Sequence, residues 1–318
     1  MGSVYITDYI SQPDIEKKEL GLLLSDNADD EVEVLLVWHQ KINGDYLDQF
    51  PNLRGVVRYG VGFDAIDLEE IKRRGLVFCN TPDYGTDEVS DTALAMILNI
   101  LRGVSKYNLF CKSYEETWQE NTIPTLRRTS EVTLGVIGAG RIGTALILKS
   151  KALKMRIVFF DPYKVSGYEK SIGIERVFSL DDLLKVSDII SIHTPLTSET
   201  RGIVDSAFIS KMKNGASLVN TARGEIIGDL DVLFEALKDG HLSHVALDVL
   251  PNEPPLPCSL INAWREGDPL LSPKITINPH TAYYTVEAYH EMRMKAAQNA
   301  RNIIEGKDAI NIIVDGRK

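Results

Sequence analysis

The amino-acid sequence predicts an α/β protein that contains two parallel β-sheets. Short apolar runs alternate with amphipathic stretches along most of the chain, which is the pattern of strand–helix–strand crossovers. The chain has 318 residues, a length typical of two domains rather than one. A Gly-x-Gly-x-x-Gly turn begins at Gly138, so the strands that precede it need a sheet of their own.

The strand predictions rest on short runs rich in Val and Ile that are bounded by turn residues. They cover Val4–Ile10, Val34–Trp38, Gly55–Tyr59, Leu76–Asn80, Leu134–Ile137, Arg156–Phe160, Asp188–His193, Ser217–Asn220, Val245–Val249 and Ile275–Asn278. The helix predictions rest on apolar residues at helical spacing. They cover Glu88–Leu101, Arg141–Leu153, Leu180–Lys185, Ser206–Met212, Leu230–Lys238 and Tyr284–Glu305.

We expect two Rossmann-like domains, one inserted into the other. The first, a discontinuous flavodoxin-like domain, would comprise residues 1–103 plus 284–318, because the last long helix is expected to return to the early strands. The inserted domain would comprise residues 104–283 and carry the glycine-rich turn.

Composition excludes several classes of protein. The formal net charge is −10, which argues against direct nucleic-acid binding, because phosphate binding needs a basic surface. Three scattered cysteines form neither a disulfide framework nor a set of metal ligands. The N-terminus, Met1–Ile10, lacks the long apolar run of a signal peptide, and no apolar run is long enough to span a membrane. We therefore expect a cytoplasmic protein without a membrane or metal partner.

The glycine-rich turn predicts a dinucleotide site. Gly138 permits a tight turn, Gly140 lets the backbone approach a pyrophosphate, and Gly143 lets helix and strand pack closely. Asp161 ends the next strand, at the spacing of an acid that binds the adenine ribose. A carboxylate there repels a 2′-phosphate, so NAD is favoured over NADP. The alternative for Asp161 is a strand-end turn residue before Pro162.

Six motifs together resemble one known family, the D-isomer-specific 2-hydroxyacid dehydrogenases. In chain order they are Arg58–Asp67, Leu134–Gly143, His193–Thr197, Asn220–Gly224, Ala246–Val249 with Asn252–Pro254, and Pro279–Ala282. The resemblance implies hydride transfer between NAD and a small 2-hydroxy or 2-keto acid.

The resemblance also assigns catalytic residues, and the chemistry suits them. His280 would exchange the proton of the substrate oxygen, since imidazole titrates near neutrality. Glu253 would fix its tautomer, and Arg223 would bind the substrate carboxylate and polarise the carbonyl. Taken singly, the three residues would instead be interpreted as a loop histidine, a turn acid and an ion-pair partner.

Further binding residues follow from the same resemblance. The implied cofactor contacts, besides the glycines and Asp161, are Arg141, Ile142, Thr194, Thr221, Ala222 and Asp248. The implied substrate contacts are Arg58, Val61, Gly62 and Tyr283.

Within the family, the chain is most similar to the branch of the C-terminal-binding proteins. Tyr283 departs from that branch, which has tryptophan there, so substrate size does not carry over. Two functions stay open: an active dehydrogenase, or an NAD(H)-sensing binding protein with secondary activity. The sequence does not name the acid.

The family also implies a homodimer, formed through the arm at residues 103–129. Tyr107, Phe110, Tyr114 and Trp118 lie there at helical spacing, and intramolecular packing is the alternative for them. A second stretch, residues 255–273, could cover the active-site mouth, extend a subunit interface, or form an exposed loop.

Overall fold

The computed structural model describes residues 3–318 and divides them into two compact units. The first unit contains the chain up to Gly85 together with Tyr284–Lys318, and the second contains Thr86–Tyr283. We had expected residues 86–103 in the first unit. They form helix α4 (Thr86–Arg102), which packs along α6 (Arg141–Ala152), and its buried apolar face belongs to the core of the second unit.

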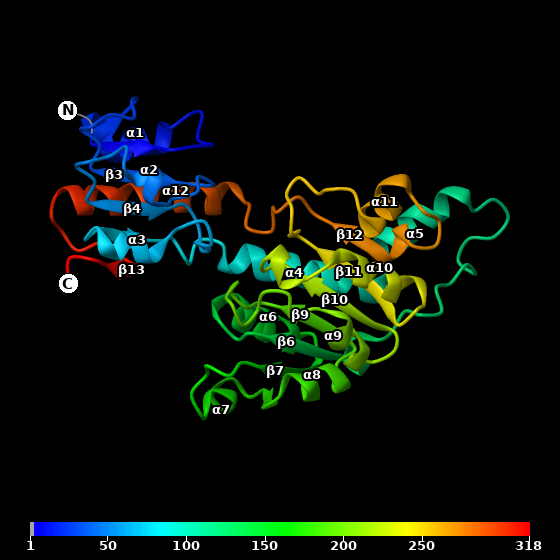
Figure 1. Cartoon of the computed structure of the whole chain (residues 1–318). Coiled ribbons are helices and arrows are strands. Elements are labelled where there is room, and N and C mark those ends of the chain that lie inside the picture. Colours follow the sequence, from blue (N-terminus) through cyan, green and yellow to red (C-terminus); the bar gives the residue numbers. More distant parts are fainter. Residues whose placement is uncertain (1–2) are drawn as a thin grey trace. The chain divides into compact units, whose positions relative to one another are not determined.

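The first unit is a six-stranded sheet in the order β13-β5-β4-β3-β1-β2 (Figure 1). Its strands are β1 (Val4–Ile6), β2 (Leu24–Ser25), β3 (Val34–Val37), β4 (Gly55–Arg58), β5 (Val77–Cys79) and β13 (Ile312–Asp315). Its helices are α1 (Asp14–Leu20), α2 (Gly44–Leu47), α3 (Leu68–Arg73) and α12 (Val286–Ile304). The order 2-1-3-4-5 of the parallel strands is flavodoxin-like. β13 is an unpredicted antiparallel edge strand.

The second unit is a parallel sheet of seven strands in the order β12-β11-β10-β9-β6-β7-β8. Its strands are β6 (Thr133–Ile137), β7 (Arg156–Phe160), β8 (Glu175–Arg176), β9 (Ile189–Ile192), β10 (Ala216–Asn220), β11 (Leu242–Leu247) and β12 (Ile275–Ile277). Besides α4 and α6, its helices are α5 (Val104–Phe110), α7 (Tyr168–Ile172), α8 (Leu180–Val186), α9 (Ser206–Lys211), α10 (Leu230–Lys238) and α11 (Ser259–Glu266). This is the Rossmann order, which confirms the predicted fold class.

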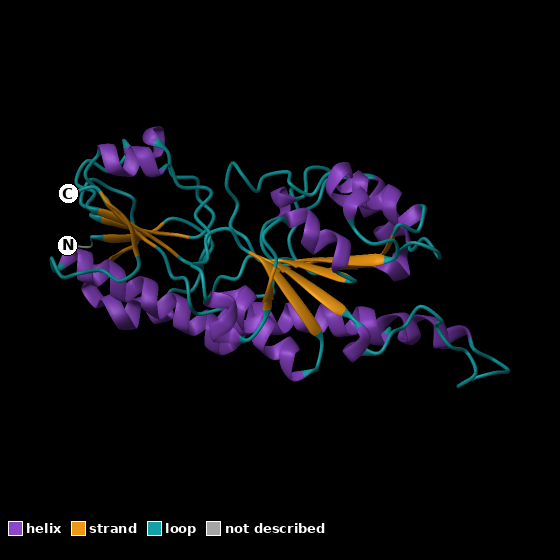
Figure 2. Ribbon diagram, turned by 90° about the horizontal axis from the view of Figure 1, so that it is seen from below, coloured by secondary structure: helices purple, strands orange, loops and turns teal. Residues whose placement is uncertain are grey.

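Helices cover both faces of each sheet (Figure 2), which explains the continuous apolar strands. All residues of β3, β6, β9 and β10 are buried, so no strand face is left for water. Short 3-10 helices lie at Gly21–Leu23, Cys111–Ser113, Thr129–Glu131, Gly224–Ile226 and Ser272–Lys274. No helix within residues 3–318 is long and apolar enough to cross a membrane.

The stretch 255–273 is not an exposed loop. Its central part is α11, which packs on α10 and buries Leu260 and Ile261 in the core of the second unit. Trp264 lies partly buried against the same core. The apolar residues of this stretch recur at helical spacing, so one face of α11 is buried in this core.

The predicted aromatic stripe of the arm does not lie on one helix. α5 ends at Phe110, so Tyr114 and Trp118 follow it in a segment that extends away from the sheet of this unit (Figures 1 and 2). Tyr107 makes an intramolecular contact: its hydroxyl accepts a hydrogen bond of 3.0 Å from the N–H of Ile123. The Trp118 side chain is 67% exposed.

Candidate functional site

The glycine-rich turn lies between β6 and α6, at the carboxyl end of the sheet. Gly138 has a φ of +88°, and a Cβ there would lie 2.6 Å from the His193 carbonyl oxygen, so only glycine fits. A Cβ on Gly143 would lie 2.0 Å from the Gly138 carbonyl oxygen. Gly140, in contrast, faces open space, with nothing within 4 Å of a Cβ. The turn thus keeps an open cradle above the first turn of α6, where Arg141 and Ile142 lie.

Asp161 lies beside this turn, directly after β7. One carboxylate oxygen accepts a 2.9 Å hydrogen bond from the N–H of Ala139, and the other accepts one of 2.9 Å from the N–H of Tyr163. The carboxylate is therefore held at the glycine-rich turn. This is where an acid can bind a ribose hydroxyl.

The turn after β9 borders the same cradle. Thr194 contacts Gly138, since a Cβ on that glycine would lie 3.0 Å from its Cγ2. The ring of His193 is hydrogen-bonded to the Ser191 hydroxyl at 2.8 Å, and burial lowers the pKa of His193 to about 4. His193 is therefore neutral at physiological pH. We assign it a structural role between β6 and β9, where the strand order of the sheet reverses.

These residues fit a bound dinucleotide. The cradle over Gly140 would be filled by any side chain, and the Thr221 hydroxyl at the end of β10 is buried without a hydrogen-bond partner among the described residues. A buried hydroxyl of this kind is costly unless a ligand or water binds it. Ala222 follows it and is partly buried.

The three predicted catalytic residues come together in the second unit. Arg223, Glu253 and His280 line one cavity of about 150 Å³. Nδ1 of His280 lies 2.7 Å from Oε2 of Glu253. Oε1 of Glu253 accepts a hydrogen bond of 2.9 Å from the N–H of Leu250. The His280 side chain is 43% exposed, so the ring is not closed off within the second unit.

Two residues that the sequence analysis did not single out build this cavity. A Cβ on Gly224 would lie 1.9 Å from the carbonyl carbon of Leu250, so only glycine allows the two segments to meet. The Asn220 side chain donates to the Arg223 carbonyl at 2.8 Å and accepts from the N–H of Ala222 at 3.0 Å. Both belong to the arginine motif, which is the signal that could have identified them.

The pKa values of the two carboxylates near this cavity, Glu253 and Asp248, are shifted in opposite directions. Burial alone would raise the pKa of Glu253, but the hydrogen bond and charge of His280 hold it below its ordinary value. Burial raises the pKa of Asp248, although three hydrogen bonds from the N–H groups of Thr281 and Ala282 oppose the shift. Asp248 thus holds the segment that carries His280, whose own N–H donates to the Asp248 carbonyl at 2.8 Å.

The predicted substrate-binding residues are distributed over both units. Three lie in the first unit and one in the second: Arg58, Val61 and Gly62, and Tyr283. Arg58 is the last residue of β4, and Tyr283 is partly buried.

The first-unit loop that follows β4 is firmly anchored. Gly60 has a φ of +115°, and its N–H donates to the Thr81 hydroxyl at 2.6 Å. Asn80 donates to the carbonyl of Val61 at 2.8 Å. The N–H groups of Val61 and Gly62 donate to no acceptor within residues 3–318, so both are available to an anion.

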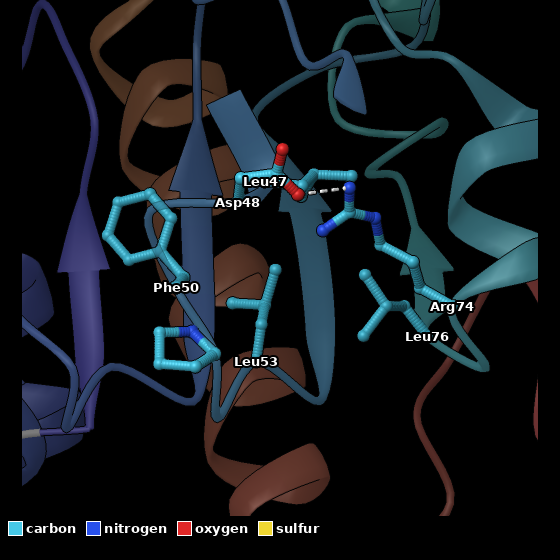
Figure 3. Close-up of a pocket in the computed structure, with 7 residues that line it drawn as sticks. Leu47, Asp48, Phe50, Leu53, Arg74 and Leu76 are labelled. Atoms are coloured by element: carbon cyan, nitrogen blue, oxygen red, sulfur yellow. Dashed lines mark hydrogen bonds and ion pairs between the residues drawn. The ribbon is translucent and has the colours of Figure 1, made fainter. Parts of the chain in front are cut away.

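A larger cavity, of about 390 Å³, lies in the first unit at the amino ends of β4 and β5 (Figure 3). It is lined by Leu47, Asp48, Phe50, Pro51, Leu53, Arg74 and Leu76. The Arg74 guanidinium is bound by the Asp48 carboxylate at 2.6 Å and by the Glu70 carboxylate at 2.8 Å. We assign no function to this cavity because its one cation is already neutralised by carboxylates of the chain.

Comparisons with known proteins identify the family of the chain. The family model for "D-isomer specific 2-hydroxyacid dehydrogenase, NAD binding domain" matches residues 94–282. Glyoxylate reductase of Korarchaeum cryptofilum is 35% identical over 271 residues, which are 84% of this chain and 76% of that protein. C-terminal-binding protein 1 of Caenorhabditis elegans is 33% identical over 287 residues, or 87% of this chain, but the chain spans only 38% of its length.

A solved structure resembles the whole chain. D-lactate dehydrogenase from Aquifex aeolicus, complexed with NAD and lactic acid, is 28% identical and has a TM-score of 0.84. The alignment covers 98% of this chain and 99% of that one. The chain therefore belongs to the D-isomer-specific 2-hydroxyacid dehydrogenase family of oxidoreductases, and its second unit contains the family's NAD-binding domain.

Proposed function

We propose that this protein is an NAD-dependent D-2-hydroxyacid dehydrogenase that also reduces 2-keto acids, with His280 as proton donor and acceptor. The observation that carries the proposal is the 2.7 Å contact of His280 with Glu253 in a cavity that Arg223 also lines. A proton-exchanging ring, a carboxylate that orients it and a fixed cation are the groups that this chemistry needs.

In the proposed mechanism, Glu253 sets the tautomer of His280. If Nδ1 of His280 donates to the Glu253 carboxylate, Nε2 is the ring nitrogen left to exchange a proton with the substrate. The lowered pKa of Glu253 keeps this carboxylate ionised, so it can accept the hydrogen bond from Nδ1 and orient the ring for keto-acid reduction. In the oxidation direction, the neutral ring accepts the hydroxyl proton.

Arg223 is proposed to bind the substrate and to polarise its carbonyl. One of its terminal nitrogens, Nη1, donates to the Ala222 carbonyl at 2.8 Å, which restrains the guanidinium beside the cavity. A restrained guanidinium can bind a carboxylate with two parallel hydrogen bonds and stabilise negative charge on the carbonyl oxygen. Val61 and Gly62 are further candidates for the carboxylate through their unused N–H groups.

Bound NAD(H) would accept or supply the hydride. Residues of the second unit would hold the dinucleotide: Gly138, Gly140, Gly143 and the first turn of α6 for the pyrophosphate, Asp161 for the ribose, and Thr221 and Asp248 near the nicotinamide. A carboxylate at the ribose disfavours a 2′-phosphate.

The substrate class is tested by the oxidation of NADH in the presence of a panel of 2-keto acids. The panel contains glyoxylate, hydroxypyruvate and pyruvate together with branched and aromatic keto acids, and the reverse assay uses D- and L-hydroxy acids. We expect turnover of at least one keto acid and preference for the D-isomer in the reverse direction. Absence of turnover with every acid, under conditions in which NADH binds, contradicts the proposal.

The second candidate is an NAD(H)-sensing binding protein like the C-terminal-binding proteins. The 33% identity to such a protein favours it, although the chain covers 38% of that relative. The two candidates differ in an observable way. A sensor would bind a protein partner with an affinity that depends on NADH and is unaffected by His280→Ala, whereas a dehydrogenase would lose its turnover.

We further propose a homodimer formed through the arm after α4. Val104, Leu109 and Trp118 in this arm are 63%, 46% and 67% exposed, so the arm offers apolar side chains for contact with another chain. A second copy would bury them. Sedimentation should give twice the chain mass at micromolar concentration, and a stable monomer contradicts the proposal.

We propose a cytoplasmic location. Cys79, Cys111 and Cys258 are all free thiols, which suits a reducing compartment. Fractionation of the source cells with a tagged chain tests this.

A further inference from the structure

The loop after β7 is held in one form by its own contacts. Besides the two hydrogen bonds that its carboxylate accepts, Asp161 accepts a bond of 2.8 Å at its carbonyl from the Arg176 guanidinium. The Arg176 side chain is 8% exposed, so this anchor lies beneath the loop. The loop therefore presents Tyr163 outward, and the Tyr163 side chain is 76% exposed.

The turn after β9 is equally well defined. The Thr200 hydroxyl donates to the Pro195 carbonyl at 2.7 Å and accepts from the N–H of Thr197 at 2.8 Å. The N–H of Glu199 donates to the Thr197 hydroxyl at 3.2 Å. These bonds fix the backbone that carries the Glu199 carboxylate.

One hydrogen bond joins the two loops. The Tyr163 hydroxyl donates to Oε2 of Glu199. β7 and β9 flank β6 on either side, so this contact spans the sheet edge at which the glycine-rich turn lies. The pKa of Tyr163 is raised above its ordinary value. The hydrogen bond to Glu199 is the largest cause, and the negative charge of Asp161 is the smallest.

The two cationic side chains near these loops, Lys164 and Arg176, contact other groups of the chain. The ammonium group of Lys164 lies 4.7 Å from the centroid of the Tyr168 ring. The Arg176 guanidinium is buried and donates to main-chain carbonyls. The adenosine end of the cradle is therefore bordered by two carboxylates, while its guanidinium lies beneath the loop.

We propose that Glu199, held in place by Tyr163, is a second specificity-determining carboxylate that selects NAD(H) over NADP(H) together with Asp161. A 2′-phosphate brings close to two negative charges toward this end of the cradle and meets a second carboxylate there. This inference rests on the proposed function only in that a dinucleotide binds here, since selectivity is measured without substrate.

The test compares the Kd values of NADH and NADPH, measured by nucleotide fluorescence at equal, low ionic strength. Glu199→Gln should lower the ratio Kd(NADPH)/Kd(NADH) by about fivefold to tenfold, mainly through tighter NADPH binding. Tyr163→Phe leaves the charge of Glu199 but frees its side chain, and should lower the ratio by about twofold. The effect of Glu199→Gln should shrink as salt is added.

The matched control is Glu175→Gln, which removes the same charge from the start of β8, where Glu175 pairs with Arg156 at 3.0 Å. Its ratio should equal that of the wild type. A Glu199→Gln ratio equal to the Glu175→Gln ratio, while Asp161→Asn lowers it, overturns the proposal. A protein that binds NADH selectively but reduces no keto acid refutes the proposed function and leaves this inference intact.

Discussion

The two ends of the NAD-binding unit both contain acidic side chains, but these side chains have different neighbours. At the proposed catalytic end, the Glu253 carboxylate contacts an imidazole ring, His280, and lines one cavity with a guanidinium, Arg223. At the adenosine end, the Asp161 carboxylate accepts only main-chain N–H groups, and Glu199 is bound by a phenol. A carboxylate beside a titratable ring affects how the ring binds a proton. A carboxylate that accepts hydrogen bonds from neutral donors stays charged and repels anions.

The difference separates two kinds of experimental effect. Changes at the catalytic end should alter the rate and its pH dependence and leave NADH binding nearly unchanged. Changes at the adenosine end should alter nucleotide affinity and selectivity and leave the rate at saturating NADH nearly unchanged.

The largest effect is expected for His280→Ala. It removes the proposed proton donor and acceptor, so turnover of any accepted 2-keto acid should fall by about 10³-fold. The Kd of NADH should stay within about twofold of the wild-type value, because the change acts on the chemical step. Steady-state rates and nucleotide fluorescence measure the two quantities. Turnover close to that of the wild type would remove His280 from the mechanism.

Arg223→Lys keeps the charge but loses the planar fork of the guanidinium. We expect kcat/KM to fall by about 10²-fold, with both a higher KM and a lower kcat, because binding and polarisation of the substrate both suffer. Lys213→Arg, on the same unit but paired with Asp188, is the control and should have normal kinetics. A change in KM alone would limit Arg223 to substrate binding.

Glu253→Gln should lower the rate by about tenfold and change its pH dependence. The variant removes a negative charge that lies 2.7 Å from the His280 ring, so keto-acid reduction should begin to fall at a lower pH than in the wild type. The lowered pKa of Glu253 also means that its charge stabilises the folded protein above the ordinary pKa of 4.5 and that this is lost as pH falls through the lowered pKa.

Two measurements check this prediction. Rate profiles from pH 5 to 10 should show the shift of the alkaline limb. The difference in Tm between wild type and Glu253→Gln should be largest near neutral pH and shrink in acid. Profiles that superimpose after scaling would mean that Glu253 does not govern the proton on His280.

At the glycine-rich turn we expect an effect as large as that of Glu253→Gln, but on nucleotide affinity and not on the rate. Gly140→Ala adds a methyl group to open space with an extended backbone, so Tm should not change, whereas the Kd of NADH should rise by about tenfold. Gly143→Ala is the matched variant: its Cβ would lie 2.0 Å from a carbonyl oxygen, so Tm should fall as well. Normal NADH binding by Gly140→Ala would mean that the cradle does not hold the pyrophosphate.

The short-range patterns of this protein were determined by its sequence alone. Runs of buried residues such as Val34–Val37 are continuous because both faces of a parallel sheet are covered, so each strand is visible as a local apolar segment. Gly138 is required by its positive φ, and Gly143 is required by its close contact with the Gly138 carbonyl, five residues earlier. Both requirements are local in the sequence. The order of the motifs around Arg223, Glu253 and His280 allowed these residues to be grouped before any distance was known.

Tertiary structure decided what depends on contacts between distant segments. Helix α4 joins the second unit because its apolar face packs on α6, a partner that the pattern of α4 alone does not name. The helix within residues 255–273 depends on burial against α10. The hydrogen bond from Tyr163 to Glu199 joins residues 36 positions apart on two separate turns. Periodicity records which face of an element is apolar, but the partner that covers this face is chosen only when the whole chain packs.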